Sequence, residues 1–309
     1  MPWTHLLLAL AVVSVWGTNF VVIRHGLDAF APLAFATLRF ALSALPWMLF
    51  IARPAVPWRR LAAFGVLLGV GQFGLLFLAM HGHITPGLAS LVVQVQVFFT
   101  IGLSLLLHRE AVRGYQLVGL VCALGGLGLI AAHVDAHVTV LGLALVLLAA
   151  FFWACANLVA KSAGRVNMLG FMVWSSAFAV PPLAALSLLF EGPQALVEGV
   201  RHANAAAWGA VLWQALGNTL FGYGAWNWLL SRHPAASVAP LALLVPVFGM
   251  GASAWWLGEP LPPWKLGAAA LVLLGLALIV LWPRWQQRLL AREAAAAGHA
   301  LTGPPRSGA

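Results

Sequence analysis

FTIGLSLLLHREAVRGYQLVGLVCALGGLGLI, residues 99–130, recurs in diverged form as FGMGASAWWLGEPLPPWKLGAAALVLLGLALI, residues 248–279. The two stretches align without gaps, and ten pairs of positions are identical, among them Phe99/Phe248, Gly102/Gly251, Ser104/Ser253, Glu110/Glu259, Leu117/Leu266, Gly126/Gly275, Leu129/Leu278 and Ile130/Ile279. So many identities in register indicate an internal duplication. Each copy is apolar and long enough to cross a bilayer, and duplicated bundles of such spans are the usual plan of secondary transporters.

The composition of the chain places it in lipid. Of its 309 residues 62% are hydrophobic and only 7% are charged, with a mean hydropathy of +0.96. A water-soluble globule cannot bury that much apolar surface. The net charge of +9 does not indicate nucleic-acid binding, because the basic residues stand singly between apolar runs and form no stripe along which a phosphate backbone would lie.

The two cysteines, Cys122 and Cys155, lie in the middle of apolar runs. This position argues against a disulfide framework and against a thiolate metal site. We therefore expect no metal and no cofactor, and we interpret both cysteines as small packing residues.

Ten segments have the length and apolar character of membrane-spanning helices. They are His5–Ile23, Pro32–Ile51, Leu61–Met80, Pro86–Leu107, Tyr115–Ala132, Val140–Ala160, Met168–Phe190, Ala206–Leu230, Ala235–Leu257 and Trp264–Trp282. With a cytoplasmic N-terminus, most of the 16 Lys and Arg residues fall on the inner side, and only Arg24, Arg201 and Lys265 fall on the outer side. Because positive residues accumulate in cytoplasmic loops, both termini are predicted to be cytoplasmic.

The duplication is predicted to be inverted. Each half holds an odd number of spans, so the second copy enters the membrane in the opposite direction to the first. The expected organisation is an all-α polytopic membrane protein with one five-helix repeat at 1–135, a second inverted repeat at 136–282 and a disordered cytoplasmic tail at 283–309. Such repeats give a scaffold two nearly equivalent packings, which is the physical basis of alternating access to a site near the midplane.

Several motifs carry a resemblance to a known family. They are Trp16-Gly17-Thr18-Asn19-Phe20, Gly87-Leu88-Ala89-Ser90, the segment Gln94 to Thr100, Trp153 to Asn157, Gly222-Tyr223-Gly224, and Val238 to Leu241 with Leu244 to Val247. With these motifs the chain resembles the ten-helix EamA-type branch of the drug/metabolite transporter superfamily over nearly all of Leu6 to Trp282. Within that branch it is most similar to bacterial exporters of O-acetylserine and cysteine. The resemblance implies export of small metabolites or amino acids across the bacterial inner membrane.

Polar residues on two related spans are candidates for the substrate pathway. In the first span Trp16 and Asn19 share a helical face, and in the sixth span Trp153 and Asn157 occupy the corresponding face. Polar groups inside lipid are costly unless they are paired, so they either line a pathway or hold helices together. The sequence leaves both interpretations of these amides open.

The eighth span carries a polar edge formed by Thr219, Tyr223 and Asn227 at successive steps of four residues. A helix facing only lipid would not keep such an edge, so we expect it to line the cavity. In the fourth span, Gln94 and Gln96 point about 200° apart on a regular helix. Both can face one cavity only if the helix is distorted there, and the sequence does not say which of them does.

Arg39 is the only charged side chain well within a predicted span, which makes it a functional candidate. It would hold a substrate carboxylate, or it would snorkel outward to carbonyl groups and Ser43. Gln72, in the third span, is a weaker candidate. In the ninth span, Pro246 deprives the Ala242 carbonyl of its usual donor. That break would expose dipoles near the midplane to a zwitterionic substrate, or it would serve packing only.

The acidic residues all map to loops, span ends or the tail. Glu110 and Glu259, equivalent in the repeat, are expected to cap the fifth and tenth helices, at whose starts they stand. Without a carboxylate at the midplane the sequence favours facilitated export down a metabolite gradient, although His81 and His83 are alternative proton carriers.

Other function classes fit less well. An intramembrane enzyme would need clustered carboxylates, a nucleophile with its base or a metal set, and the histidines have no such spacing. A broad-specificity efflux carrier and, less favoured, a channel remain alternatives. The expected partners are a small-molecule substrate and the lipid bilayer, with no nucleic acid, and the sequence leaves the oligomeric state open.

Overall fold

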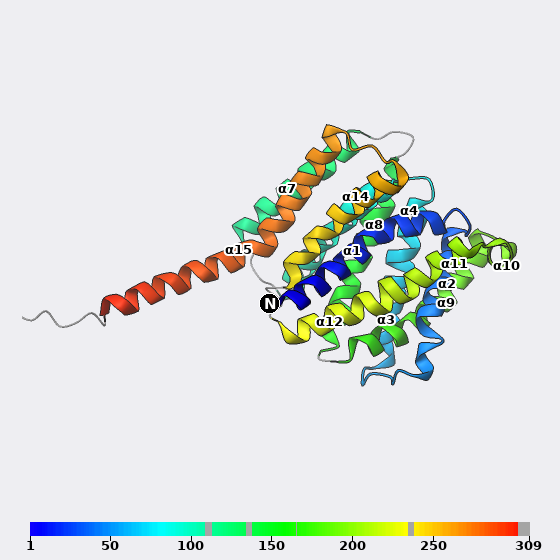
Figure 1. Cartoon of the computed structure of the whole chain (residues 1–309), viewed down its shortest axis with the longest axis horizontal. Coiled ribbons are helices and arrows are strands. Elements are labelled where there is room, and N and C mark those ends of the chain that lie inside the picture. Colours follow the sequence, from blue (N-terminus) through cyan, green and yellow to red (C-terminus); the bar gives the residue numbers. More distant parts are fainter. Residues whose placement is uncertain (109–112, 134–137, 165, 234–237, 302–309) are drawn as a thin grey trace, which may run out of the picture.

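The computed structural model of the chain is a bundle of helices (Figure 1). It describes residues 1–108, 113–133, 138–164, 166–233 and 238–301, and within these ranges it contains helices and no strand. The prediction of an all-α polytopic membrane protein is therefore confirmed.

The bounds of the helices follow the predicted spans closely. In the first half they are α1 (Trp3–Gly26), α2 (Pro32–Ala44), η1 (Trp47–Leu49), α3 (Trp58–Val66), η2 (Leu67–Gly74), α4 (Leu75–Met80), α5 (Pro86–Val92), η3 (Val93–Val95), α6 (Gln96–His108) and α7 (Gly114–Ala131). In the second half they are α8 (Val140–Ser162), α9 (Met168–Phe190), α10 (Pro193–His202), α11 (Ala205–Leu212), η4 (Trp213–Phe221), α12 (Gly222–Arg232), η5 (Ala239–Leu244), α14 (Val245–Leu257) and α15 (Pro263–Leu301).

Eight of the ten predicted spans are helices long and apolar enough to cross a membrane within the described residues. The other two are the eighth and the ninth. The run 205–232 is continuous and helical but carries buried polar residues, among them Gln214 and Asn218. The apolar helix of the ninth span, Leu241–Leu257, is shorter than the others. The count of ten is therefore approximate by the criterion of length and hydropathy alone.

The packing of the helices repeats between the two halves. The counterparts α2 and α9 pack against each other, and so do α7 and α15, the helices of the duplicated segment (Figure 1). The contact of α1 with α14 has its equivalent in the contact of α8 with α6. Likewise α1 packs on the eighth span as α8 packs on the third span. Two copies of one five-helix unit, related by an internal two-fold axis, would produce this pattern.

The departures from the regular α-helix also occur twice. The third span contains the π-helical segment η2 and the eighth span contains the π-helical segment η4, at equivalent places. The fourth and ninth spans contain the 3-10 segments η3 and η5. Wide π-helical turns are costly and are found mostly at functional sites, so these four segments direct attention to the middle of the bundle.

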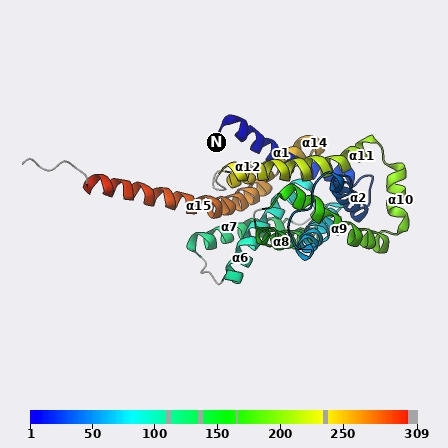
Figure 2. The same ribbon diagram turned by 90° about the horizontal axis from the view of Figure 1, so that it is seen from below.

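The last helix extends beyond the expected end of the membrane domain. Helix α15 continues through Pro283 to Leu301 and projects out of the bundle (Figures 1 and 2). Residues 283–301 therefore form a helix, whereas the sequence predicted a tail without structure after Trp282. Residues 302–309 lie outside the described part of the chain.

Candidate functional site

Arg39 lies at the centre of a buried polar cluster. Its side chain is only 1% exposed, and its Nη2 donates a hydrogen bond to Thr219 Oγ1 at 3.3 Å. Its guanidinium carbon lies 3.4 Å from the centre of the Phe73 ring. A cation over an aromatic face is stabilised by the ring quadrupole. The cluster thus joins the second, third and eighth spans, two of which carry π-helical segments.

The hydrogen-bonding capacity of Arg39 is only partly used. Its Nε and Nη1 are buried and have no partner among the described residues. The ion pairs of the described residues likewise do not include Arg39. Ser43, which the snorkelling alternative names as a partner of the Arg39 side chain, donates its Oγ hydrogen bond to the Arg39 backbone carbonyl. A buried cation with free donors is costly unless an anion or water completes it.

Gln214 is a member of this cluster that the sequence did not predict. Its Nε2 donates to Asn19 Oδ1 at 2.6 Å, and its backbone carbonyl accepts from Thr219 Oγ1 at 2.9 Å. Gln214 lies outside the predicted Thr219, Tyr223 and Asn227 edge because the helix there is π-helical, so residues five apart meet. The sequence feature that could have identified Gln214 is its position, as a polar residue five positions before Thr219.

Trp16, on the first span, packs against aromatic side chains of the eighth span. Its ring centre lies 5.5 Å from that of Tyr223 and 5.2 Å from that of Trp226. The indole Nε1 donates to the Asn218 carbonyl at 3.3 Å. Gly222 lets the two helices approach, because a Cβ there would collide with the Trp16 ring. The side chain of Asn227, the third residue of the predicted edge, lies outside the described residues.

A second polar group joins the fourth and sixth spans. Asn157 Nδ2 donates to Gln96 Oε1 at 2.9 Å, and Thr100 Oγ1 donates to the Gln96 backbone carbonyl at 2.7 Å. This geometry matches the interhelical hydrogen bond that was one of the two interpretations of Asn157. Gln94 is buried, and it lies in the 3-10 segment η3, which distorts the helix directly before Gln96.

Gln72 and Trp153 complete the set of predicted residues. Gln72 is buried in η2, and its Oε1 has no partner among the described residues. Trp153 is half buried and packs against the hydrophobic core of the bundle. In the ninth span the Ala242 carbonyl is not free, because the Val245 N–H bonds to it in the 3-10 pattern. The break at Pro246 therefore exposes fewer dipoles than the sequence indicated.

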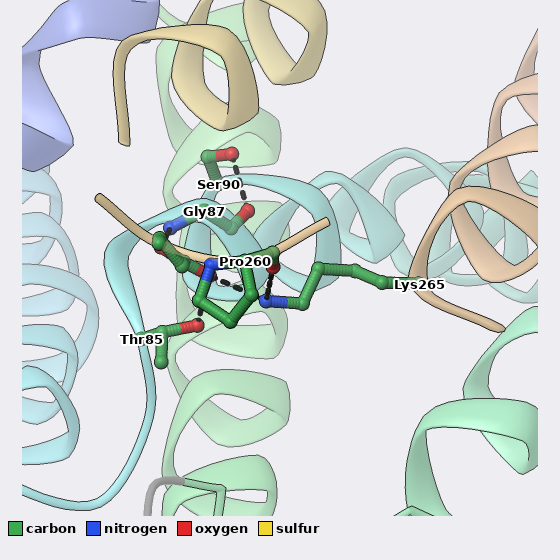
Figure 3. Close-up of polar contacts among 6 residues, drawn as sticks. Thr85, Gly87, Ser90, Pro260 and Lys265 are labelled. Carbon is green, nitrogen blue, oxygen red and sulfur yellow. Dashed lines mark hydrogen bonds and ion pairs between the residues drawn. The ribbon is translucent and has the colours of Figure 1, made fainter. Parts of the chain in front are cut away.

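Glu259 caps a helix, but not the one that the sequence predicted. Its carboxylate accepts a hydrogen bond from the Gly87 N–H at the start of α5, in the other half of the chain (Figure 3). The reason is that Lys265 and Thr85 hold the carboxylate at that helix start. Its counterpart Glu110 lies outside the described residues.

Metal binding finds no support in the described part of the chain, where no group of three or more His, Cys, Asp or Glu side chains is placed to hold an ion. Cys122 and Cys155 are free thiols. Two pockets open near the ends of the bundle. One of about 530 Å³ is lined by residues that include Arg24, Thr85 and Pro86, and one of about 360 Å³ lies beside Trp213.

Comparison with known proteins agrees with this architecture. The model of the EamA-like transporter family matches residues 3–132 and again 140–281. A crystal structure with 17% sequence identity superposes with a TM-score of 0.62, over 93% of this chain and 99% of that chain. At that identity the similarity concerns the fold alone.

Curated relatives are similar over most of their length. A Salmonella typhimurium protein described as a probable amino-acid metabolite efflux pump is 40% identical over 88% of this chain and 93% of its own. An Escherichia coli protein with the same description is 39% identical over 91% of this chain and 96% of its own. A probable terminal-alkyne amino-acid exporter of Streptantibioticus cattleyicolor is 27% identical over 88% and 91%.

The family matches cover both halves of the chain, and the helices of the membrane domain carry the length and hydropathy that a membrane requires. The predicted resemblance is thus confirmed, and so is the predicted location, as a multi-pass protein of the bacterial inner membrane. The chain belongs to the EamA-like transporter family.

Proposed function

We propose that this chain exports small zwitterionic amino-acid metabolites from the cytoplasm by alternating access, and that Arg39 binds the substrate carboxylate. The family and the descriptions of the relatives support metabolite export. The observation that carries the finer proposal is that Arg39, Gln72 and Gln214 all hold buried polar atoms without a partner among the described residues.

These unpartnered atoms are of two complementary kinds. Arg39 offers two buried donors, Nε and Nη1. Gln72 and Gln214 each offer a buried Oε1 acceptor without a partner among the described residues. A carboxylate pairs with the planar guanidinium in two parallel hydrogen bonds, and an ammonium group donates up to three bonds to such acceptors. An α-amino acid carries both groups on one carbon atom, so one such molecule would satisfy donors and acceptors together.

The rest of the cluster fits a small, partly apolar side chain. Trp16 and Phe73 supply aromatic surface beside Arg39 and Tyr223. The family resemblance points to cysteine and O-acetylserine, both of which are neutral amino acids of suitable size. A broad-specificity metabolite carrier remains the second candidate, because an aromatic wall with a few amides discriminates weakly between small side chains.

The energy source that we favour is the substrate gradient itself. The carboxylates that the structure describes belong to Asp28, Glu191, Glu198 and Glu259, which lie in turns, in a loop or in the short helix α10, and no hydrogen bond or ion pair given for them involves Arg39. Coupled carriers place an ionisable or oxygen-rich site along the pathway. Transport into inverted vesicles, which corresponds to export from the cell, should therefore continue when the pH gradient is collapsed while the substrate gradient is held. Abolished transport would refute the uncoupled mechanism.

Export itself is tested in cells that overproduce the chain. Cells should resist toxic cysteine and release O-acetylserine faster than cells with an empty vector, and Arg39→Gln should remove both effects at equal protein level. Arg53→Gln is the matched control, since Arg53 stacks on Trp58 at the end of the bundle and not within it. Equal resistance in the empty-vector, parent and Arg39→Gln strains would contradict the proposal.

A further inference from the structure

The outer half of the bundle is closed by helices that approach unusually closely. With the orientation that the Lys and Arg distribution predicts, α5 and α14 are the outer halves of the fourth and ninth spans. They pack against each other and against α1. A Cβ at Gly249 of α14 would overlap Ser90 of α5, and a Cβ at Gly17 of α1 would lie 2.7 Å from the Val245 carbonyl oxygen. Only glycines permit this contact, which we term the outer seal.

The inner half of the bundle lacks the equivalent contact. In the internal two-fold relation, α1 corresponds to α8, α5 to η5, and α14 to α6. The contact of α5 with α14 therefore corresponds to a contact of η5 with α6. Likewise, the contact of α1 with α5 corresponds to a contact of α8 with η5. In the part of the chain that the structure describes, the outer pairs pack extensively and the inner pairs do not. An alternating carrier whose related contacts differ in this way is closed on the side where they are made.

A buried ion pair lies next to the outer seal (Figure 3). Lys265 Nζ bonds to Glu259 Oε1 at 2.8 Å and to the Pro260 carbonyl at 2.9 Å. Glu259 Oε2 accepts the Gly87 N–H at 3.0 Å, and Thr85 Oγ1 bonds to the same carboxylate. Glu259 and Lys265 are only 8% and 4% exposed. The carboxylate thus ties the loop after α14 to the start of α5.

This arrangement is not required by the fold. Buried ion pairs add little stability compared with apolar residues of similar volume, so stability alone does not explain why this ion pair is present. The duplication offers an internal comparison, because Gln116 stands where the second half has Lys265. Gln116 Oε1 accepts the Arg113 N–H of its own helix start. A lysine at this position therefore exists at the outer end of the bundle only.

An open pocket lies on the outer side of the contact between Glu259 and the start of α5. Thr85, which bonds to Glu259, and the adjacent Pro86 line the cavity of about 530 Å³ together with His81. Beyond α5's first turn, toward the middle of the bundle, Ser90 and Leu91 are fully buried. The Glu259 carboxylate thus stands where the outer pocket ends and the close-packed seal begins.

We propose that Glu259, held by Lys265, is the latch of the outer gate: its carboxylate fastens the fourth span to the ninth, and it must leave the start of α5 before the carrier opens outward. This proposal rests on the proposed alternating export. In the opened state the N–H groups at the start of α5 and the Thr85 hydroxyl form hydrogen bonds with water instead of with Glu259. Lys265 keeps its hydrogen bond to the Pro260 carbonyl. The outer seal of Gly17, Ser90 and Gly249 then separates.

The test is a distance measurement that needs no substrate. Spin labels are placed on His81→Cys and Trp256→Cys, two exposed positions at the outer ends of the third and ninth spans, in a chain with Cys122→Ala and Cys155→Ala. In lipid the otherwise unchanged chain should show mainly one short label distance. Glu259→Gln, which keeps the volume of the side chain, should raise the share of a longer distance about fivefold or more.

Two further variants keep the outcome decisive if Glu259→Gln folds poorly. Gly249→Ala should have the same effect by wedging the seal, whereas Gly251→Ala, whose Cβ would meet nothing within 4 Å on the same helix, should leave the distances unchanged. Lys265→Met should act in the same direction as Glu259→Gln. Unchanged distances in both Glu259→Gln and Gly249→Ala would overturn the latch, even if amino-acid export is intact. A chain that opens as predicted but exports no amino acid would instead refute the proposed function.

Discussion

Arg39 concentrates the chemistry of the site in one side chain. A guanidinium that binds a carboxylate through two nitrogens cannot be replaced by an ammonium group, which offers a point charge on a flexible stem. We expect Arg39→Lys to raise the half-saturating substrate concentration about 10- to 100-fold, as the loss of a charged hydrogen bond of about 1.5–3 kcal/mol requires. Initial export rates from vesicles over a range of substrate concentrations measure this effect.

The control for this prediction is Arg53→Lys, which should keep the half-saturating concentration within the error of the assay. A similar rise in both variants would mean that Arg39 acts on the stability of the bundle and not on the substrate.

A histidine pair gives a pH-dependent contact at the inner end of the bundle. His5 Nδ1 and His233 Nε2 lie 2.6 Å apart, so one ring must be the donor and the other the acceptor. Desolvation, and then the nearby His5, the N-terminal amino group and Arg232, hold the pKa of His233 below its usual value of 6.5. Its neutral form is thus the one that the fold favours.

The sign of the pH effect follows from this direction. A depressed histidine pKa contributes stability above about pH 6.5 that is lost as the pH falls through the lower, folded value. Thermal melting of the parent in detergent should therefore show a lower midpoint at about pH 5 than at about pH 8. In His233→Gln the thermal midpoints at the two pH values should differ by less than they do in the parent. If the midpoints of both proteins differ equally between the two pH values, the histidine pair is not the source of the pH dependence.

The sequence identified Arg39 because a lone charge in an apolar span needs no structural information to be noticed. It missed Gln214 because helical periodicity of 3.6 residues places it away from Thr219, and only the π-helical turn brings them together. It paired Glu259 with the wrong helix, because a cap supplied by the other half of the chain has no local signature.

At the scale of elements, apolar length predicted where helices lie, and their interruptions escaped prediction. These interruptions are the π-helical segments η2 and η4 and the 3-10 segments η3 and η5. They depend on tertiary packing, which the hydropathy of the sequence does not report. Pro246 and the glutamines of the fourth span indicated two of the four interruptions. The remaining two, η2 and η4, contain no proline, and their sequences would also suit a regular helix.

The pair α7 and α15 offers a direct test of packing within the duplicated segment. A Cβ at Gly126 would lie 2.7 Å from Val272 Cγ2 and 2.9 Å from the Ala268 carbonyl oxygen, whereas a Cβ at Gly128 would meet nothing within 4 Å. We expect Gly126→Leu to destabilise the protein by about 1–3 kcal/mol through overpacking.

The matched variant Gly128→Leu is expected to keep the thermal midpoint of the parent, since its side chain projects into lipid. Midpoints measured in the same detergent compare the two. Equal losses in both variants would show that α7 and α15 are not packed as described.

At the scale of the whole molecule, the duplication accounts for the scaffold and its divergence accounts for the function. The contacts of α1 and α8 with their neighbours repeat between the halves. The groups that differ are those around the pathway: Arg39 with Gln214 on one side, and Gln96 with Asn157 on the other. We therefore propose that the symmetric helices supply the alternating motion and that the asymmetric residues select the substrate.

The measurement that tests the central claim most directly is counterflow in vesicles containing the purified chain. Vesicles preloaded with unlabelled cysteine should take up labelled cysteine transiently, as a carrier does and a channel does not. Cysteamine, which lacks the carboxylate, and cysteine methyl ester, in which it is blocked, should fail to drive this uptake, because neither can pair with Arg39. Counterflow driven equally well by all three compounds would contradict recognition of the carboxylate, and uptake that never exceeds equilibrium would contradict a carrier.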